Sequence, residues 1–149
     1  MFPGSTKPAI HSAAWFDSMG LIGLLAVCAL PATALAAPRL RCTIDQGGTT
    51  QTVDSAPVND PYRVESTDIN GRFRFKAVAV GDEKQVRYVK LYSYYRANGR
   101  WMLLHEASYE TPAIQTGGAT DALTGRHSLY SPGRERELQY GCTLVEAAP

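Results

Sequence analysis

The chain has 149 residues, of which 44% are hydrophobic and 19% are charged, and its formal net charge at pH 7 is +1. These proportions are typical of a globular protein with room for one domain, and they argue against a disordered tail. A net charge this close to zero also argues against general electrostatic attraction to nucleic acid, so we expect no nucleic-acid partner. Any charged ligand must therefore be bound by a local patch.

The N-terminal segment, residues 1–36, has the pattern of a secretory signal peptide. Its apolar run, residues 21–30, is followed by a proline and then by Ala34 and Ala36, small residues at the two positions that a signal peptidase reads. The run is shorter than the ~20 apolar residues needed to span a bilayer. We therefore predict cleavage after Ala36 and export of residues 37–149 as a single β domain. We expect a periplasmic or extracellular location and no membrane insertion after cleavage.

Three alternatives concern the same segment. The stretch before the apolar run is long and weakly basic, and translation from Met19 instead of Met1 would remove most of it. The run would remain as a membrane anchor if no peptidase cleaved it. Lipid attachment at Cys28 is a further alternative because Leu25 lies three residues before the cysteine, although Val27 is larger than a lipidation site usually accepts.

Removal of the signal peptide leaves two cysteines in the chain, Cys42 and Cys142. In an oxidising compartment, two cysteines in a small domain are typical of a structural disulfide, with two buried thiols as the alternative. A disulfide that closes a loop on the order of 100 residues contributes up to roughly 4 to 5 kcal/mol in the chain-entropy model. That contribution is comparable with the whole net stability of a small domain.

Strict alternation of apolar and polar residues recurs along the mature chain, whereas helical periodicity never lasts longer than about two turns. We therefore predict an all-β fold, a small antiparallel β-sandwich or barrel of about 7 to 8 strands. In the first strand Leu40 and Ile44 flank Cys42 on an apolar face, and in the last strand Tyr140 and Cys142 share such a face. Further strands are expected over residues 49–53, 62–67, 72–80, 85–96 and 100–110.

The best-specified local element is the Asn-Gly dipeptide at residues 98–99, which suits a two-residue type I′ turn because both residues tolerate positive φ. This turn sets a register in which Tyr94 faces Leu103 and Tyr92 faces His105. One face of the hairpin is then aliphatic and the other aromatic.

The strand expected over residues 72–80 decides which face is interior. Its phenylalanines alternate with three basic residues, and burial of three unpaired cations is prohibitive. A three-residue connection at residues 81–83 places the phenylalanines on the aliphatic side and sets Arg74 opposite Lys90. The outer face then carries Arg72, Arg74, Lys76, Tyr88, Lys90, Tyr92, Tyr94, Trp101 and His105. A one-residue slip would exchange the two faces.

This basic and aromatic face is the candidate ligand or partner surface. Guanidinium groups over aromatic rings make cation–π contacts, and a mixture of charge, stacking and fixed donors binds anionic or sugar-like ligands. An anion would also relieve the like-charge pair of Arg74 and Lys90. One alternative is an ordinary solvated sheet face, because Arg and Lys stems commonly cover exposed tyrosines. Another is a second core, in which a further layer of strands covers the aromatic residues.

Reaction-specific patterns are absent from the mature sequence. His105 and His127 lack the spacing of a metal motif, and Ser128 and Ser131 lie near His127 without a nucleophile elbow. We therefore expect no metal, no cofactor and no enzymatic activity. The prediction is a binding or interaction module of the cell envelope, whose partner is a protein, a glycan or an anionic ligand and whose oligomeric state stays open.

Two other functions remain as alternatives. The first is an inhibitor that inserts a loop, residues 117–125 or 131–133, into an envelope-acting or foreign hydrolase. The second is a small hydrolase whose site assembles on folding from His105, Glu106 or Asp residues. A cluster with perturbed pKa values in a deep cleft would favour the hydrolase, and a flat exterior around His105 would count against it.

Overall fold

The structure is a computed structural model that describes residues 36–133 and 135–147 of the chain. The predicted signal peptide, apart from Ala36, lies outside the described residues, as do the alternatives at Met19 and Cys28. Export and cleavage therefore stay predictions. Within the described ranges, no helix is long and apolar enough to cross a membrane.

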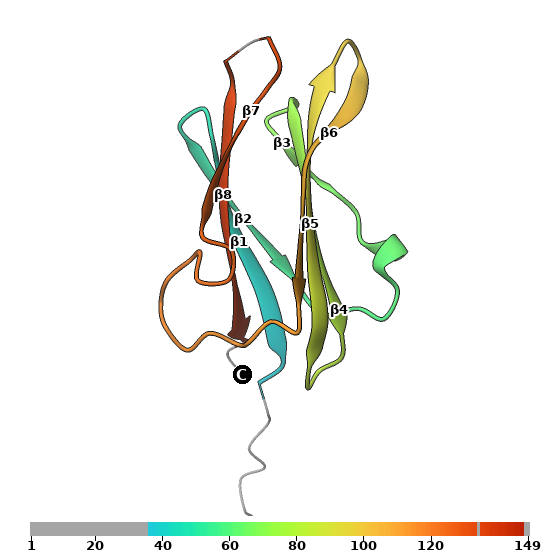
Figure 1. Ribbon diagram of the computed structural model, residues 1–149, viewed down its shortest axis with the longest axis vertical. Helices are drawn as coiled ribbons and strands as arrows, with labels where there is room; N and C mark the ends of the chain where they lie inside the picture. Colours follow the sequence, from blue (N-terminus) through green and yellow to red (C-terminus); the bar gives the residue numbers. More distant parts are fainter. Residues whose placement is uncertain (1–35, 134, 148–149) are drawn as a thin grey trace, which may run out of the picture. The chain divides into compact units, whose positions relative to one another are not determined.

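Two four-stranded antiparallel sheets make up the described chain and pack face to face (Figure 1). The first sheet has the strand order β2-β1-β8-β7 and the second the order β3-β4-β5-β6. The strands are β1 (Pro38–Gln46), β2 (Thr49–Ser55), β3 (Thr67–Ile69), β4 (Phe73–Gly81), β5 (Val86–Ala97), β6 (Arg100–Glu110), β7 (Arg126–Tyr130) and β8 (Glu137–Glu146). A short 3-10 helix, η1 (Pro61–Arg63), precedes β3. The all-β prediction is confirmed, and of the two architectures the chain adopts the sandwich.

The interior lies between the two sheets and is built from alternate residues of their central strands. Leu40 and Ile44 of β1 and Phe73 and Phe75 of β4 are fully buried. The rings of Phe75 and Tyr140 meet across the sandwich, with centroids 5.0 Å apart. Each large apolar side chain buried in this way stabilises the fold by roughly 1.5 to 3 kcal/mol. The prediction that the phenylalanines face inward is confirmed.

The predicted disulfide joins Cys42 of β1 to Cys142 of β8. The two residues are direct cross-strand partners with Cα atoms 4.1 Å apart, and both are fully buried. The bridge therefore links neighbouring strands of the first sheet that are 100 residues apart in the sequence. It ties the first strand of the domain to the last.

The longest hairpin joins β5 to β6 through the turn at residues 98–99. Asn98 and Gly99 have φ angles of 50° and 79°, the positive values that a type I′ turn requires. Near the turn the pairing is as predicted, with Tyr94 opposite Leu103. The dipeptide therefore predicts this part of the sheet correctly.

Further along the same hairpin a β-bulge changes the register. Leu104 has no partner on β5, so that His105 lies opposite Ser93 and Tyr92 lies opposite Glu106. The predicted pairing of His105 with Tyr92 is wrong for this reason. Because an extra residue turns the following side chains to the other face, His105 lies on the interior side of the sheet.

The connection between β4 and β5 is wider than predicted. The Asp82 amide donates to the Gln85 carbonyl over 2.9 Å, and the Asp82 carboxylate accepts hydrogen bonds from two backbone amides of the turn. This capped turn moves the register by an even number of residues, so the predicted faces are kept. The predicted pairing of Arg74 with Lys90 is wrong, because Arg74 lies opposite Tyr94.

The segment between β2 and β3 crosses from the first sheet to the second. Val58 forms a parallel bridge to the end of β4, and β3 later pairs with the beginning of β4. The strand predicted over residues 62–67 is wrong except at Thr67, where β3 begins. Pro61 occupies the start of η1, and the Asp60 carboxylate accepts a hydrogen bond from the Tyr62 amide, which stabilises a helical turn instead.

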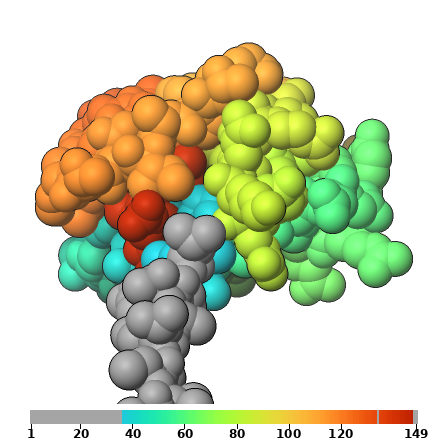
Figure 2. All heavy atoms as spheres, turned by 90° about the horizontal axis from the view of Figure 1, so that it is seen from below, coloured from blue at the N-terminus to red at the C-terminus, as the bar shows by residue number. Residues whose placement is uncertain are grey.

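The connection from β6 to β7 returns from the second sheet to the first. The Gln115 amide donates to the Leu144 carbonyl over 2.7 Å, and the Leu123 amide donates to the Cys142 carbonyl over 3.0 Å. Seen from one end of the sandwich, the orange atoms of this connection lie beside the red atoms of β8 (Figure 2). The sequence did not predict β7, which follows this connection and pairs with β8.

Candidate functional site

Seven of the nine residues of the predicted surface line two adjoining hollows on the outer face of the second sheet. These residues are Arg74, Lys76, Tyr88, Lys90, Tyr92, Tyr94 and Trp101. Arg72 is exposed in the turn before β4 and lines neither hollow. The prediction that His105 belongs to this surface is wrong, because the bulge at Leu104 turns its side chain toward the other sheet.

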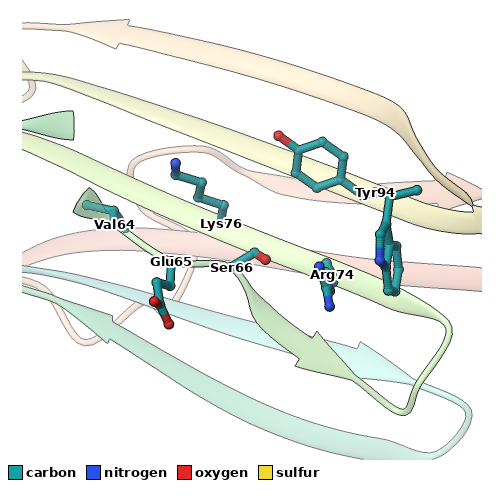
Figure 3. A pocket seen from close by; sticks show the side chains of 7 residues that line it. Val64, Glu65, Ser66, Arg74, Lys76 and Tyr94 are labelled. Carbon is teal, nitrogen blue, oxygen red and sulfur yellow. The ribbon is translucent and has the colours of Figure 1, made fainter. Parts of the chain in front are cut away.

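The two hollows form one groove, which we call the basic–aromatic groove. The first hollow has a volume of about 490 Å³ and the second of about 350 Å³. They share Lys76 and Tyr94, so the groove runs over both β4 and β5. Residues 64–66, which lead into β3, form the wall of the first hollow (Figure 3). Residues 61–62 of η1 form the wall of the second.

This wall exists because the segment between β2 and β3, residues 56–66, is fixed at both ends. Val58 is held against the end of β4 by two backbone hydrogen bonds of 2.9 and 3.1 Å. Thr67 is held against the beginning of β4, where it pairs with Phe75. Between these anchors the chain turns through η1 and does not pair with β4, and it thereby borders the middle of the outer face.

Arg74 and Lys76 supply positive charge to the groove. They project from the same face of β4, since alternate residues of a strand share a face. Neither makes an ion pair with a carboxylate in the part of the chain that the structure describes. The Arg74 guanidinium instead lies 4.2 Å from the centre of the Trp101 ring, and that of Arg96 lies 5.9 Å from the same ring. Such stacking leaves the in-plane N–H groups of Arg74 free for a ligand.

Lys90, at the other end of the groove, is differently placed. Its ammonium lies 3.6 Å from the carboxylate of Glu106, and both side chains are partly exposed. An exposed pair of this kind contributes little to stability and is readily exchanged for a ligand group. The like-charge contact between Lys90 and Arg74 that the sequence predicts does not form, because Lys90 lies opposite Val78.

Tyrosine rings make the floor of the groove. The rings of Tyr92 and Tyr94 are nearly parallel, with an interplanar angle of 20° and centroids 6.4 Å apart. Burial is the main cause that raises the pKa of Tyr92, while Lys90 acts in the opposite direction. The hydroxyl therefore keeps its proton at neutral pH and can donate it to a ligand. On the wall, Tyr62 is 92% exposed.

The groove combines positive charge, aromatic rings and hydrogen-bond donors. Arg74 and Lys76 supply charge, the rings supply stacking area, and the tyrosine hydroxyls supply donors. None of the residues that line the groove is a histidine or a cysteine. Comparisons of the chain with family models, curated proteins and solved structures find no match. The ligand class is therefore inferred from the groove itself.

A second group of polar aromatic residues lies between the sheets where β6 approaches β7. It contains His105, Tyr109, His127 and Tyr140, and we call it the histidine–tyrosine cluster. The Tyr140 hydroxyl lies 3.0 Å from His105 Nδ1, and the two imidazole rings have centroids 5.2 Å apart. The His127 ring stacks on Tyr140 at 4.9 Å. No spacing in the sequence indicates this cluster, because the bulge and the pairing of the sheets bring its members together.

Burial controls protonation in the cluster. It lowers the pKa of His105, which the neighbouring His127 lowers further. It raises the pKa of both Tyr109 and Tyr140. The Tyr140 hydroxyl is therefore the donor to a neutral His105. His127 Nε2 donates to the Thr124 carbonyl over 3.1 Å, which links the cluster to the connection before β7.

The cluster does not bring together His105 and Glu106, two of the residues named for the hydrolase alternative. His105 and Glu106 are consecutive on β6 and point to opposite faces of the sheet. Among residues 36–133 and 135–147, no three His, Cys, Asp or Glu side chains are grouped so that they could hold a metal ion. Ser93, opposite His105, is buried, and its hydroxyl has no hydrogen-bond partner among the same residues.

Proposed function

We propose that the protein is a non-enzymatic binding module, exported to the cell envelope or beyond it, that captures an anionic ligand in the basic–aromatic groove. The observation that carries the proposal is the position of Arg74 and Lys76. The two cations lie on one face of one strand, line the same hollow and have no ion-pair partner among the described residues. A ligand anion would supply that partner.

The energetics of such a contact are favourable at an open site. A hydrogen bond between a guanidinium or ammonium and an anionic group contributes roughly 1.5 to 3 kcal/mol. Contact with the rings of Trp101 and Tyr94 adds apolar burial at about 25 cal/mol per Å². Because the groove is open to solvent, we expect the affinity to fall as salt screens the charges.

The two alternative functions have less support. Insertion of residues 117–125 as an inhibitory loop would be restrained near the end of the loop, where the Leu123 and Thr124 amides donate to the Cys142 carbonyl of β8. A hydrolase built on His105 and Glu106 would need two side chains that point apart. The groove is already formed by its lining residues, so binding there needs no change in the fold.

Removal of the two cations tests the proposal. The variant is Arg74→Ala/Lys76→Ala, and the matched control is Arg39→Ala/Lys84→Ala, which removes the same charge from exposed positions outside the groove. Binding to immobilised polyanions is measured for both. We expect the groove variant to lose affinity at least about tenfold and the control to stay close to the parent protein. Equal losses in the two variants would show that only net charge matters and would contradict the proposal.

A further inference from the structure

The shape of the basic–aromatic groove points to a chain-like ligand. Its two hollows are continuous through Lys76 and Tyr94, with Trp101 at one end and Tyr88 at the other. A site for a compact small molecule is a closed pocket that surrounds most of the ligand. A shallow groove along a sheet instead contacts one side of an extended molecule at several points.

The floor of the groove is suited to flat, partly apolar units. Tyr92 and Tyr94 present rings that are nearly parallel, at 20° to each other, and Trp101 adds a third ring. A pyranose ring has an apolar face of C–H groups and a rim of hydroxyls. A tyrosine has the matching construction, an apolar ring with a polar tip.

The charges of the groove are mixed. The unpaired cations Arg74 and Lys76 lie in the first hollow, but Glu65 lines the same hollow and Glu106 pairs with Lys90 beside the second. A densely charged polyanion such as polyphosphate would meet both carboxylates as like charges, which costs binding energy. A chain with spaced anionic groups and hydroxyls between them avoids this cost, because hydroxyls donate to carboxylates.

The backbone around the groove is already paired. The ladders between β4 and β5 and between β5 and β6 run beneath the whole floor. The other edge of β4 is occupied by β3, by Val58 and by the Ser55 hydroxyl, which donates to the Ala77 carbonyl over 3.0 Å. An extended peptide that binds by strand addition therefore has no free edge in the groove.

From these observations we infer that the groove binds a linear polysaccharide that carries carboxylate groups. The inference rests on the proposed function, since it names the ligand class of the same groove. A sugar carboxylate is held by the in-plane N–H groups of Arg74 and by the ammonium of Lys76, while Trp101 and Tyr94 contact the sugar rings. The planar guanidinium matches a carboxylate with two parallel hydrogen bonds.

Calorimetric titration of the purified protein tests the inference with five probes. Two are carboxylated polysaccharides, polygalacturonate and hyaluronate, and a third is the methyl ester of polygalacturonate, which has the same sugars without the charge. The other two are poly-L-glutamate and inorganic polyphosphate. We expect a carboxylated polysaccharide to bind at least about tenfold more tightly than the ester and than the two other polyanions.

Substitutions assign the binding to the groove. Arg74→Gln and Trp101→Ala should each reduce the affinity for the carboxylated polysaccharide about tenfold, whereas Arg39→Gln should leave it unchanged. Thermal unfolding of each variant establishes that it is folded. If Trp101→Ala does not fold, Trp101→Leu removes the ring with a smaller loss of volume, and Lys76→Gln removes the second cation of the groove.

The outcomes separate the inference from the proposed function. Tighter binding of poly-L-glutamate or polyphosphate, with the same dependence on Arg74, would overturn the polysaccharide as the ligand and leave the anion-binding groove in place. Equal binding of the uncharged ester would show that the carboxylate is not recognised, and would contradict both the carboxylated ligand and the anion-binding groove. Failure of all four anionic probes would overturn both.

Discussion

The basic–aromatic groove and the histidine–tyrosine cluster draw on the same hairpin of β5 and β6, but they use aromatic side chains in opposite ways. In the groove, the rings of Tyr94 and Trp101 lie at the surface beside cations that have no ion-pair partner among the described residues. In the cluster, the polar atoms of His105 and Tyr140 are bonded to each other between the sheets. An aromatic residue on this hairpin therefore packs between the sheets or lines the groove according to which side of the sheet it occupies.

The bulge at Leu104 decides between these two roles. Without an extra residue, strict alternation from Leu103 would put His105 on the outer face with Trp101. With it, His105 and Tyr109 face the other sheet and meet His127 and Tyr140. One residue thus separates a binding surface from an interior contact.

The largest expected difference between the two regions is in stability. Tyr140→Ala removes a fully buried ring that contacts Phe75 and His127, and should lower the free energy of unfolding by about 3–5 kcal/mol. Tyr92→Ala removes a partly exposed ring of the groove and should cost about 1 kcal/mol or less. Urea unfolding of both variants measures the difference. Similar losses in the two would contradict the assignment of Tyr140 to the interior and Tyr92 to the surface.

A smaller change isolates the hydrogen bond of the cluster. Tyr140→Phe keeps the ring and removes the donor to His105 Nδ1, which should lower the free energy of unfolding by about 1 kcal/mol. It should also raise the pKa of His105, because a bond that favoured the neutral imidazole is lost. Titration of the imidazole proton resonances checks this. An unchanged His105 pKa would show that the hydroxyl does not act on this ring.

The pH dependence of stability should also reflect the cluster. The pKa of His105 is lower in the folded protein than in the unfolded chain, so below about pH 6.5 the unfolded chain binds more protons. The free energy of unfolding should therefore fall as the pH falls from about 7 to about 5, and fall less in His105→Gln. The pKa values of Asp45 and Asp82 are lowered by hydrogen bonds, so these two residues affect the free energy of unfolding at more acidic pH. Parallel pH profiles for the parent and His105→Gln would refute this role of His105.

The smallest expected effect is at Ser93. Its hydroxyl is buried without a hydrogen-bond partner among the described residues, so Ser93→Ala removes a desolvated group at little loss of packing. We expect a change between zero and about 1 kcal/mol in the stabilising direction. Chemical denaturation gives the sign. A clear destabilisation would mean that the hydroxyl has a partner, such as a buried water.

The sequence predicts the parts of this fold that depend on local rules. Alternation predicts which residues of β4 face the interior, because Arg74 and Lys76 cannot be buried unpaired and the alternating Phe73 and Phe75 therefore face inward. The Asn98-Gly99 dipeptide predicts its own turn because few residues tolerate positive φ. The cysteine positions predict the disulfide because both lie on apolar faces of strands.

The remaining features depend on contacts between distant segments. The bulge at Leu104 has no local signal, and a single unpaired residue moves His105 to the other face. The wall over residues 61–66 forms because Val58 and β3 attach to the same strand, which alternation does not reveal. The sequence therefore predicts the floor of the groove on β4 and β5. It does not predict the wall of the groove or the histidine–tyrosine cluster.

The central claim is that ligands bind at the groove and not at the cluster. A ¹H–¹⁵N correlation spectrum of the protein, titrated with polygalacturonate, tests both halves of it at once. The account predicts progressive shifts of the Trp101 indole and of the Lys76 and Tyr94 amides, with the His127 and Tyr140 amides unmoved. Shifts confined to His127 and Tyr140, or a spectrum with no change at Trp101, would contradict it.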